Sequence, residues 1–387
     1  MAYGDLIYLD NAATSYPKPG ECLRRALDQY LRIGGSPGRG SYDLAVEADN
    51  IVSEVREELS LFFGGDSRYR LCFAYNATEA LNTLLQGVAK PGSHVVSTWL
   101  EHNSVLRPLH HLREEGRVEF DLVRFDQNGF VDPGEIAAAI RSNTRLVVVN
   151  HASNVLGTIQ PVADIGEICR DRGIPLFLDV SQSAGLIPIE VSEWNVAGLA
   201  FTGHKALLGP TGIGGLLVSQ EVEISPSRFG GTGVDSSNPF HTAEYPYRLE
   251  AGTVNLLGIL ALRETLAYVK GLNRDKHYQR EMALLARLRD GLMALDNVEV
   301  YGSQNVDNRL PLLCCNVRGR RPDDVAAVLD GDFNIAVRAG LHCAPLVHKH
   351  LGTAPEGAIR FSLGAYTGEE DIEAAIQAMS AIARSTG

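Results

Sequence analysis

A lysine placed directly after an apolar segment is the first residue whose setting favours chemistry. Lys205 follows the apolar run that ends at Thr202, and a glycine-rich stretch at 209–215 comes after it. An amine that forms a Schiff base must lose its proton near neutral pH, which requires a sheltered, positively biased site. Most lysines are solvated surface residues, so the setting of Lys205 alone does not show whether it forms a Schiff base or is an ordinary surface lysine.

A carboxylate at the end of another apolar segment indicates which cofactor the lysine could bind. Asp179 ends the run that begins at Leu176, and the carboxyl ends of strands in open α/β sheets face the ligand crevice. A buried carboxylate keeps the pyridine nitrogen of pyridoxal 5'-phosphate (PLP) protonated, so that the ring can accept electrons. Gln182 could then hydrogen-bond the ring hydroxyl oxygen. The alternative for Asp179 is a helix N-cap or a turn, but its order relative to Lys205 is typical of fold-type I PLP enzymes.

A phosphate site is expected where the segment ending at Tyr75 meets a helix that begins near Thr78. Free backbone N–H groups and the positive end of the helix converge there, although the same residues also fit a simple N-cap. Thr202 and His204 supply a hydroxyl and an imidazole for the same anion. His102 follows the next strand and could stack on a planar cofactor and shuttle a proton, although a lone histidine is more often structural.

Two further residues are candidates for handling substrate. Cys343 lies in a short polar connection, where His342 and Arg338 are expected to lower its pKa; the alternative is an inert thiol. Arg360 sits inside an apolar strand and needs a partner, which is either a substrate carboxylate or a structural ion pair. His342, His348 and His350 have no matching acidic or cysteine cluster to complete a site, so no metal is predicted.

Alternating strands and helices must position these residues. Short apolar runs at 71–75, 94–99, 119–125, 146–151, 176–180, 199–202 and 214–218 predict seven strands, and helical periodicity predicts helices at 78–89, 104–114, 133–140 and 162–172. Strands separated by helices imply right-handed crossovers and a mostly parallel seven-stranded sheet. The fold class is therefore α/β.

The pattern changes after residue 255. Helices at 256–270, 276–295 and 369–383 and strands at 298–301, 312–317 and 359–363 predict a smaller α+β domain. We divide the chain into a large PLP-binding domain at 16–260 and a small domain formed by 1–15 and 261–387. The glycine- and serine-rich stretch 230–238 is predicted to be a mobile loop.

Composition excludes several classes of function. The net charge of −12 argues against a nucleic-acid binder and against docking on anionic membranes. There is no apolar run of about 18 residues and no signal-peptide pattern, so no membrane span is expected. The six cysteines form no C-x-x-C pair, which favours a reducing, cytoplasmic location.

Seven ordered motifs resemble one known family. They lie at 8–14, 76–80, 101–103, 150–158, 179–182, 202–205 and 250–255. Together they resemble the cysteine desulfurase and selenocysteine lyase branch of the class V aminotransferases, over residues 6–363. The surroundings of Cys343 resemble the short-loop subgroup, in which the cysteine is held rigidly beside the cofactor.

The resemblance implies a role for each candidate. Lys205 would carry PLP as a Schiff base, Cys343 would form a persulfide, and His102 would stack on the ring. The implied cofactor ligands are Ala77, Thr78, His102, Asn154, Asp179, Gln182, Thr202, His204, Lys205 and Thr253, and the implied substrate ligands are Asn154, Arg338 and Arg360. Thr253 would reach the phosphate of a neighbouring subunit, which implies a homodimer. Ala77 stands where the family often has a hydroxyl residue.

The predicted function is therefore a PLP-dependent cysteine desulfurase that converts L-cysteine to L-alanine. L-selenocysteine is a second candidate substrate, and an acceptor protein for the sulfur is a candidate partner; no nucleic acid and no membrane are expected. Two alternatives stay open. One is another class V PLP enzyme, an aminotransferase or a cysteine β-lyase, in which Cys343 is a bystander. The other is a non-catalytic PLP-binding partner in sulfur relay.

Overall fold

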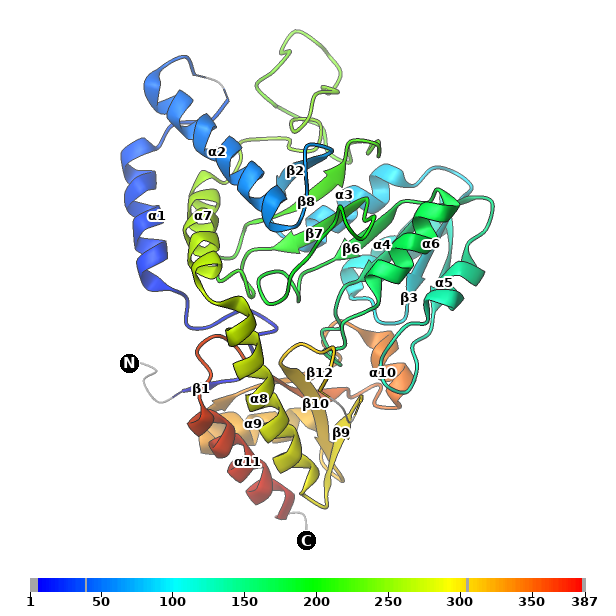
Figure 1. Ribbon diagram of the computed structural model, residues 1–387, viewed down its shortest axis with the longest axis vertical. Helices are drawn as coiled ribbons and strands as arrows, with labels where there is room; N and C mark the ends of the chain where they lie inside the picture. Colours follow the sequence, from blue (N-terminus) through cyan, green and yellow to red (C-terminus); the bar gives the residue numbers. More distant parts are fainter. Residues whose placement is uncertain (1–5, 39, 304–305, 385–387) are drawn as a thin grey trace.

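The protein is built from two units that lie one above the other (Figure 1). The computed structural model describes residues 6–38, 40–303 and 306–384. The upper unit is organised around a seven-stranded sheet and the lower unit around a four-stranded sheet. Helix α7 (Leu256–Gly271) belongs to the upper unit, and α8 (Arg274–Met293) leads directly from it into the lower one.

The larger sheet confirms the seven predicted strands. They are β2 (Tyr69–Ala74), β3 (Ser93–Thr98), β4 (Val118–Val123), β5 (Thr144–Asn150), β6 (Leu176–Asp179), β7 (Gly198–Thr202) and β8 (Gly214–Ser219). Their order is β2-β8-β7-β6-β5-β3-β4, and β8 is antiparallel to both of its neighbours. The turn between β7 and β8 is too short for the helical crossover that a parallel pair needs.

Helices cover both faces of this sheet. The four predicted crossover helices are confirmed as α3 (Ala77–Val88), α4 (Asn103–Glu114), α5 (Pro133–Ala139) and α6 (Val162–Arg172). Two helices that the sequence patterns had not indicated precede them, α1 (Gly20–Ile33) and α2 (Asp43–Phe62), and α1 packs against α7.

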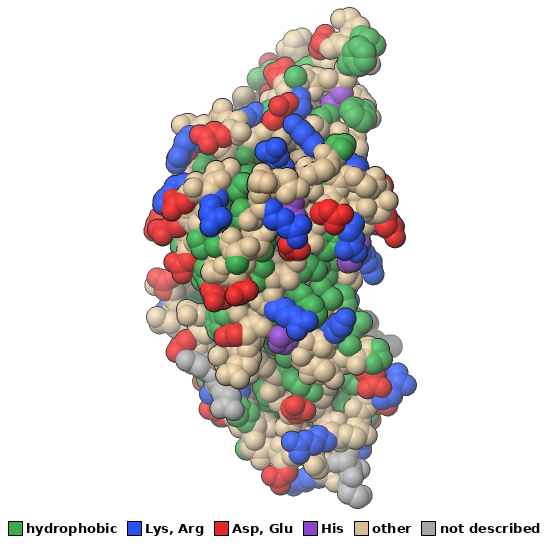
Figure 2. Space-filling view, turned by 90° about the vertical axis from the view of Figure 1, so that its right-hand side faces the viewer, with side chains coloured by type: hydrophobic (Ala, Val, Ile, Leu, Met, Phe, Trp, Pro, Cys, Tyr) green, Lys and Arg blue, Asp and Glu red, His purple; other side chains and the backbone are tan. Residues whose placement is uncertain are grey.

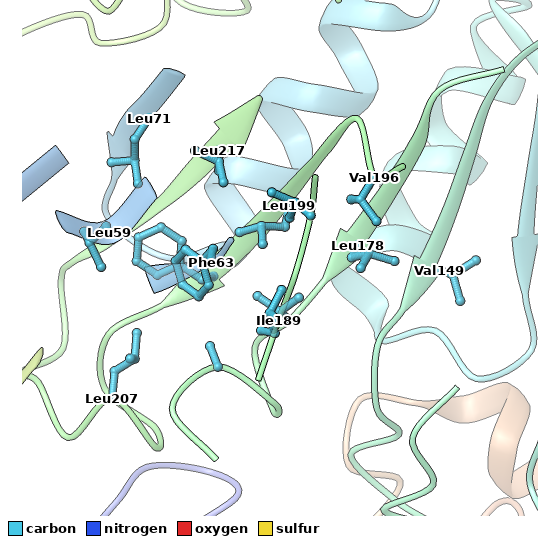
Figure 3. Packing of buried hydrophobic residues seen from close by; sticks show 14 of the residues in the cluster. Leu59, Phe63, Leu71, Val149, Leu178, Ile189, Val196, Leu199, Leu207 and Leu217 are labelled. Atoms are coloured by element: carbon cyan, nitrogen blue, oxygen red, sulfur yellow. The ribbon is translucent and has the colours of Figure 1, made fainter. Parts of the chain in front are cut away.

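The larger unit has a hydrophobic core on each face of its sheet, one that includes α2 and one that includes α3 and α4. Figure 3 shows side chains from neighbouring strands, among them Leu71, Leu199 and Leu217, pointing to the side where Phe63 lies. The rings of Phe63 and Phe201 have centroids 5.1 Å apart. Each fully buried side chain of this size stabilises the fold by roughly 1.5–3 kcal/mol, so this packing fixes the strands whose ends carry polar residues.

The smaller unit is antiparallel. Its sheet has the order β12-β13-β10-β9, formed by β9 (Val298–Tyr301), β10 (Leu312–Val317), β12 (Arg338–Gly340) and β13 (Ala358–Ser362). Helices α8, α9 (Pro322–Phe333) and α11 (Glu369–Arg384) pack on it, and α10 (Pro345–Leu351) follows the connection that carries Cys343. The division at 15/16 and 260/261 remains a prediction, and its outermost residues, 1–5 and 385–387, lie outside the described residues.

The N-terminal segment joins the two units. Strand β1 (Ile7–Tyr8) pairs with β11 (Ile335–Ala336) of the smaller unit. A few residues later, Ser15 N donates a hydrogen bond of 3.1 Å to the carbonyl of His204, beside the end of β7. The segment between them therefore crosses the boundary where the predicted site residues meet.

The surface carries both signs of charge. On the face shown in Figure 2, acidic and basic side chains are interspersed. Within the described ranges, no helix combines the length and the apolar character needed to cross a bilayer.

Candidate active site

One cavity brings the predicted residues together. It has a volume of about 240 Å³ and lies at the ends of β6 and β7, facing the smaller unit. Every predicted site residue except Thr253 lines it. The predicted residues that do so are Ala77, Thr78, His102, Asn154, Asp179, Gln182, Thr202, His204, Lys205, Arg338, Cys343 and Arg360.

The amine of Lys205 is desolvated at the floor of this cavity. Burial lowers its pKa from the ordinary 10.5 to about 8, and the cations Arg360 and Arg338 act in the same direction. The carboxylate of Asp179 opposes this shift. A large fraction of the amine is therefore unprotonated at slightly alkaline pH, which is the form that attacks a carbonyl.

Asp179 is held in place by its own turn. It is the last residue of β6, and its Oδ1 accepts hydrogen bonds from the backbone N–H (2.9 Å) and the hydroxyl of Ser181. Among the described residues, nothing hydrogen-bonds its Oδ2. Gln182 is fixed differently, because its Nε2 donates to the carbonyl of Ala12 at 3.1 Å. One carboxylate oxygen of Asp179 is therefore left for a ligand.

The opposite end of the cavity has the donors of an anion site. Ala77 and Thr78 form the first turn of α3, whose N-cap Asn76 accepts a hydrogen bond from Glu79 N at 2.9 Å. Facing this turn, Thr202 Oγ1 and His204 Nδ1 are buried and have no hydrogen-bond partner in the described part of the chain. Buried polar atoms without partners are costly unless a ligand satisfies them, so these residues fit the phosphate of PLP.

His102 presents its second nitrogen to the cavity. Its Nδ1 accepts a hydrogen bond from the backbone N–H of Ser104 at 3.0 Å, because His102 is the N-cap of α4. The ring proton therefore sits on Nε2. Burial lowers the pKa of His102, so the ring is neutral near pH 7.

Both interpretations of Arg360 are compatible with its surroundings. One nitrogen, Nη2, forms an ion pair with Asp10 at 2.9 Å, and Nη1 donates to the backbone carbonyl of Asn154 at 3.0 Å. Its Nε is buried without a partner in the described ranges, as is the side-chain oxygen of Asn154. A structural ion pair is present, and polar atoms remain for a carboxylate ligand.

The loop that carries Cys343 is strained and tied down. His342 and Cys343 have φ angles of 50° and 56°, a left-handed conformation that costs on the order of 1–3 kcal/mol per residue outside glycine. The carbonyl of His342 accepts from Asn154 Nδ2 at 2.7 Å, and that of Cys343 accepts from Asn103 N at 2.7 Å. Cys343 is exposed, whereas the other five cysteines are buried.

His342 lies next to Cys343 as an uncharged ring. Burial and the neighbouring Arg360 lower the pKa of His342 to about 2, so its ring carries no charge at neutral pH. It contacts His348 instead, with 3.3 Å between Nδ1 and Nε2. No group of three or more His, Cys, Asp or Glu within the described ranges could hold a metal ion.

Three residues of the site were not assigned roles from the sequence. Asp10 pairs with Arg360, and Ser181 holds Asp179. Glu101 lies buried behind His102, and burial raises its pKa to about 8 while Thr98 and Asn150 hydrogen-bond its Oε1. Asp10 and Glu101 stand inside motifs at 8–14 and 101–103, so acidic residues in these motifs were the available signal.

Comparison with known proteins assigns this chain to a family. A model of the class V aminotransferases matches residues 7–375. The chain belongs to the class V aminotransferase family. Two similar relatives are a probable cysteine desulfurase of Methanothermobacter thermautotrophicus, 35% identical over 95% of this chain and 92% of the relative, and a cysteine desulfurase of Haloferax volcanii, 29% identical over 97% and 89%.

Solved structures agree with this class V aminotransferase. The apo cysteine desulfurase of Thermococcus onnurineus superposes with a TM-score of 0.91 and 33% identity, covering 99% of this chain and 96% of that one. A cysteine desulfurase of Escherichia coli gives a TM-score of 0.87 and 25% identity, with 99% and 96% covered. The predicted fold class, fold-type I with a large mostly parallel sheet, and the resemblance to cysteine desulfurases are confirmed.

Proposed function

We propose that this class V aminotransferase binds PLP and converts L-cysteine to L-alanine, with the sulfur passing to Cys343 as a persulfide. The observation that carries the proposal is that Lys205, from the larger unit, and Cys343, from the smaller unit, line one cavity. A cofactor attachment point and an exposed thiol in one cavity fit a reaction that removes sulfur from an amino acid. The cysteine desulfurases among the relatives and solved structures support the same activity.

The cofactor assignment rests on three groups of donors. Lys205 would be the covalent attachment point, Asp179 would pair with the ring nitrogen, and Gln182 would bind the ring oxygen. The first turn of α3, Thr202 and His204 would hold the phosphate. Bound PLP supplies an electron-withdrawing ring that stabilises negative charge on the α-carbon of an amino acid.

The side chains of the chain itself then bind substrate and move protons. Arg360 and Asn154, with Arg338 at the rim, bind the substrate carboxylate. Lys205 takes the α-proton, which suits an amine with a pKa of about 8. His102 carries its proton on Nε2, so it would donate that proton at the cofactor ring.

Sulfur transfer is a displacement at the substrate sulfur. The thiolate of Cys343 attacks that sulfur, an S–S bond forms, and the carbon–sulfur bond breaks. The former β-carbon gains a proton, which leaves alanine. No external oxidant or reductant is consumed, and the same residues would act on L-selenocysteine.

Assembly and location complete the proposal. Thr253 is exposed and lies outside the cavity, beside Arg228 and Glu250. We assign it to the phosphate of a second copy, so the active form is a homodimer of the short-loop subgroup. All six cysteines are free, which fits the reducing cytoplasm.

One assay tests the proposed function. The purified protein is examined for the absorbance of bound PLP, supplied with L-cysteine or L-selenocysteine, and assayed for alanine, pyruvate and sulfide. We expect bound PLP and alanine in the wild type and in Lys270→Ala, whose lysine is exposed on α7, and no alanine from Lys205→Ala. Wild-type protein that binds no PLP would contradict the proposal, and pyruvate in place of alanine would indicate a β-lyase.

A further inference from the structure

A second cavity begins at Cys343 and leads away from the candidate active site. It has a volume of about 460 Å³, within the range of about 300–1,000 Å³ typical of ligand pockets. Thr78, His102, Ser104 and Cys343 line both cavities. The Cys343 thiol can therefore be approached from two sides. We call the second cavity the α3–α4 groove.

Two rows of side chains with helical spacing form the walls of the groove. Thr78, Asn82 and Gln86 come from α3, and they stand four residues apart on one face of the helix. The amide of Asn82 donates to the carbonyl of Thr78 at 2.9 Å, and that of Gln86 donates to Asn82 Oδ1 at 3.2 Å. This wall is polar and already ordered.

The wall formed by α4 adds positive charge. Asn103, Arg107 and His111 have the same four-residue spacing and lie along the groove. Arg107 is exposed, and its guanidinium has no hydrogen bond or ion pair within the described part of the chain. The positive charge of Arg107 also acts on the active site electrostatically, because it adds to the effect of burial in lowering the pKa of His102.

The far end of the groove is closed by a fixed arginine. Arg117 donates to the carbonyls of Gln86 (3.0 Å) and Ala89 (3.1 Å), and its Nη1 lies 3.6 Å from Glu115. The groove thus carries two arginines against one carboxylate, in a chain whose net charge is −12. A local excess of positive charge on an acidic protein selects anionic ligands.

We propose that the α3–α4 groove binds the sulfur acceptor, and that this acceptor is a small thiol with a negatively charged group that Arg107 holds. The inference rests on the proposed function, because it assigns the step that empties the Cys343 persulfide. The volume suits a molecule of a few amino acids in size, and the side-chain amides of Asn82 and Gln86 on α3 match the donors and acceptors of a peptide-like backbone.

The transfer step balances without a redox partner. The acceptor thiol loses its proton to solvent, and its thiolate attacks the outer sulfur of the persulfide. A new S–S bond forms on the acceptor, the S–S bond to Cys343 breaks, and Cys343 leaves as a thiolate. One neutral sulfur atom changes its carrier, so the enzyme is ready for the next substrate.

A first experiment probes the groove independently of the proposed function. Cys343 in the purified protein is alkylated with iodoacetate, which is anionic, and in parallel with iodoacetamide, which is neutral and of similar size. Rates are read by mass spectrometry of the Cys343 peptide. Relative to the wild type, we expect Arg107→Gln to lower the iodoacetate/iodoacetamide rate ratio several-fold and Arg107→Glu to lower it about tenfold or more. Arg24→Glu, a charge reversal on α1, should leave the ratio within twofold.

A second experiment measures the transfer itself. Protein loaded with one equivalent of L-cysteine is mixed with 3-mercaptopropionate, 2-mercaptoethanol or cysteamine, and loss of the Cys343 persulfide is followed. We expect the anionic thiol to discharge the wild type at least about tenfold faster than the neutral one, and Arg107→Glu to remove this preference. Equal rates for the three thiols, or an alkylation ratio that Arg107→Glu does not change, would overturn the inference and favour an acceptor protein. Wild type that forms no persulfide while the alkylation ratio responds as expected would contradict the proposed function alone.

Discussion

The backbone N–H of Asn103 donates a hydrogen bond of 2.7 Å to the carbonyl of Cys343. This bond joins the first turn of α4, in the larger unit, to the loop of the smaller unit that carries the candidate nucleophile. His102 directly precedes Asn103. The same hydrogen bond therefore holds His102 and Cys343 close together, although they are far apart in the sequence. Because Cys343 and its neighbour His342 both have left-handed backbones, we infer that this contact stabilises a loop that would otherwise relax.

The pH dependence of cofactor attachment should follow Lys205. Since the pKa of Lys205 is lowered to about 8, the unprotonated amine increases as the pH rises through 8, well below the ordinary 10.5. We expect the rate of PLP attachment to the apo-protein to rise with a midpoint near pH 8. Asp179→Asn removes the carboxylate that raises this pKa, so its midpoint should be lower. Stopped-flow absorbance from pH 6 to 10 checks both, and a midpoint near 10 in the wild type would be inconsistent with a desolvated lysine.

Thr202→Val should weaken PLP binding without weakening the fold. The buried hydroxyl of Thr202 has no partner in the described part of the chain, so valine removes an unsatisfied group from the apo-protein. The phosphate loses one hydrogen bond, which corresponds to roughly a tenfold higher Kd. Fluorescence titration of apo-protein measures the Kd, thermal unfolding measures stability, and Thr202→Ser is the matched control. An unchanged Kd in the valine variant would remove Thr202 from the phosphate site.

Substitutions of Arg360 and Asp10 should have different effects: one on substrate binding and the other on the stability of the fold. Arg360→Lys keeps the charge but loses the planar fork, so we expect KM for cysteine to rise about tenfold and kcat to change less. Asp10→Asn keeps the guanidinium and breaks the ion pair, which should cost about 1–3 kcal/mol after allowing for the partial exposure of Asp10. Steady-state kinetics and denaturant unfolding distinguish the two effects. A KM that stays constant in Arg360→Lys would make Arg360 a structural residue.

Glu281 offers a stability test outside the active site. This residue of α8 is buried, burial raises its pKa to about 7, and its Oε2 has no partner in the described ranges. Because the folded-state pKa lies above the ordinary 4.5, the cost of the ionised carboxyl is absent at low pH. It grows as the pH rises from about 4.5 to 7, to roughly 3 kcal/mol at most.

Glu281→Gln removes this cost. Its Tm should exceed that of the wild type by several degrees at pH 8 and by much less at pH 5. The exposed Glu57→Gln on α2 serves as the control and should show no such difference. A Tm gain of equal size at both pH values would mean that the effect comes from packing and not from ionisation.

The sequence predicted the strands of the larger sheet from short segments rich in apolar residues, which are nearly continuous in β6, β7 and β8, whereas β4 alternates apolar residues with Glu119 and Asp121. It also predicted that Asp179 and Lys205 meet, since Asp179 ends β6, Lys205 follows β7, and the carboxyl ends of these parallel strands share one edge. Helix α2 went unrecognised although Ala48, Ile51, Val55 and Leu59 repeat at helical spacing. That signal was present in the sequence.

Other features could not be read from the sequence. Asp10 and Arg360 are 350 residues apart, and only the pairing of the N-terminal segment with the smaller unit brings them together. His342 and Cys343 have left-handed backbones, but neither position is a glycine, the residue that usually signals this conformation in a sequence. The neutral state of His342 depends on burial and on Arg360, which lies in a strand that follows it in the chain.

A single-turnover measurement on Cys343 tests the central claim most directly. The PLP-loaded protein is mixed with less than one equivalent of L-cysteine in the absence of added thiol, and the Cys343 peptide is analysed by mass spectrometry while alanine is quantified. We expect one alanine for each Cys343 that gains a sulfur atom, and we expect Cys343→Ala to bind PLP without forming a persulfide. Alanine or pyruvate formed at the wild-type rate in Cys343→Ala, with Cys343 of the wild type unmodified, would contradict it.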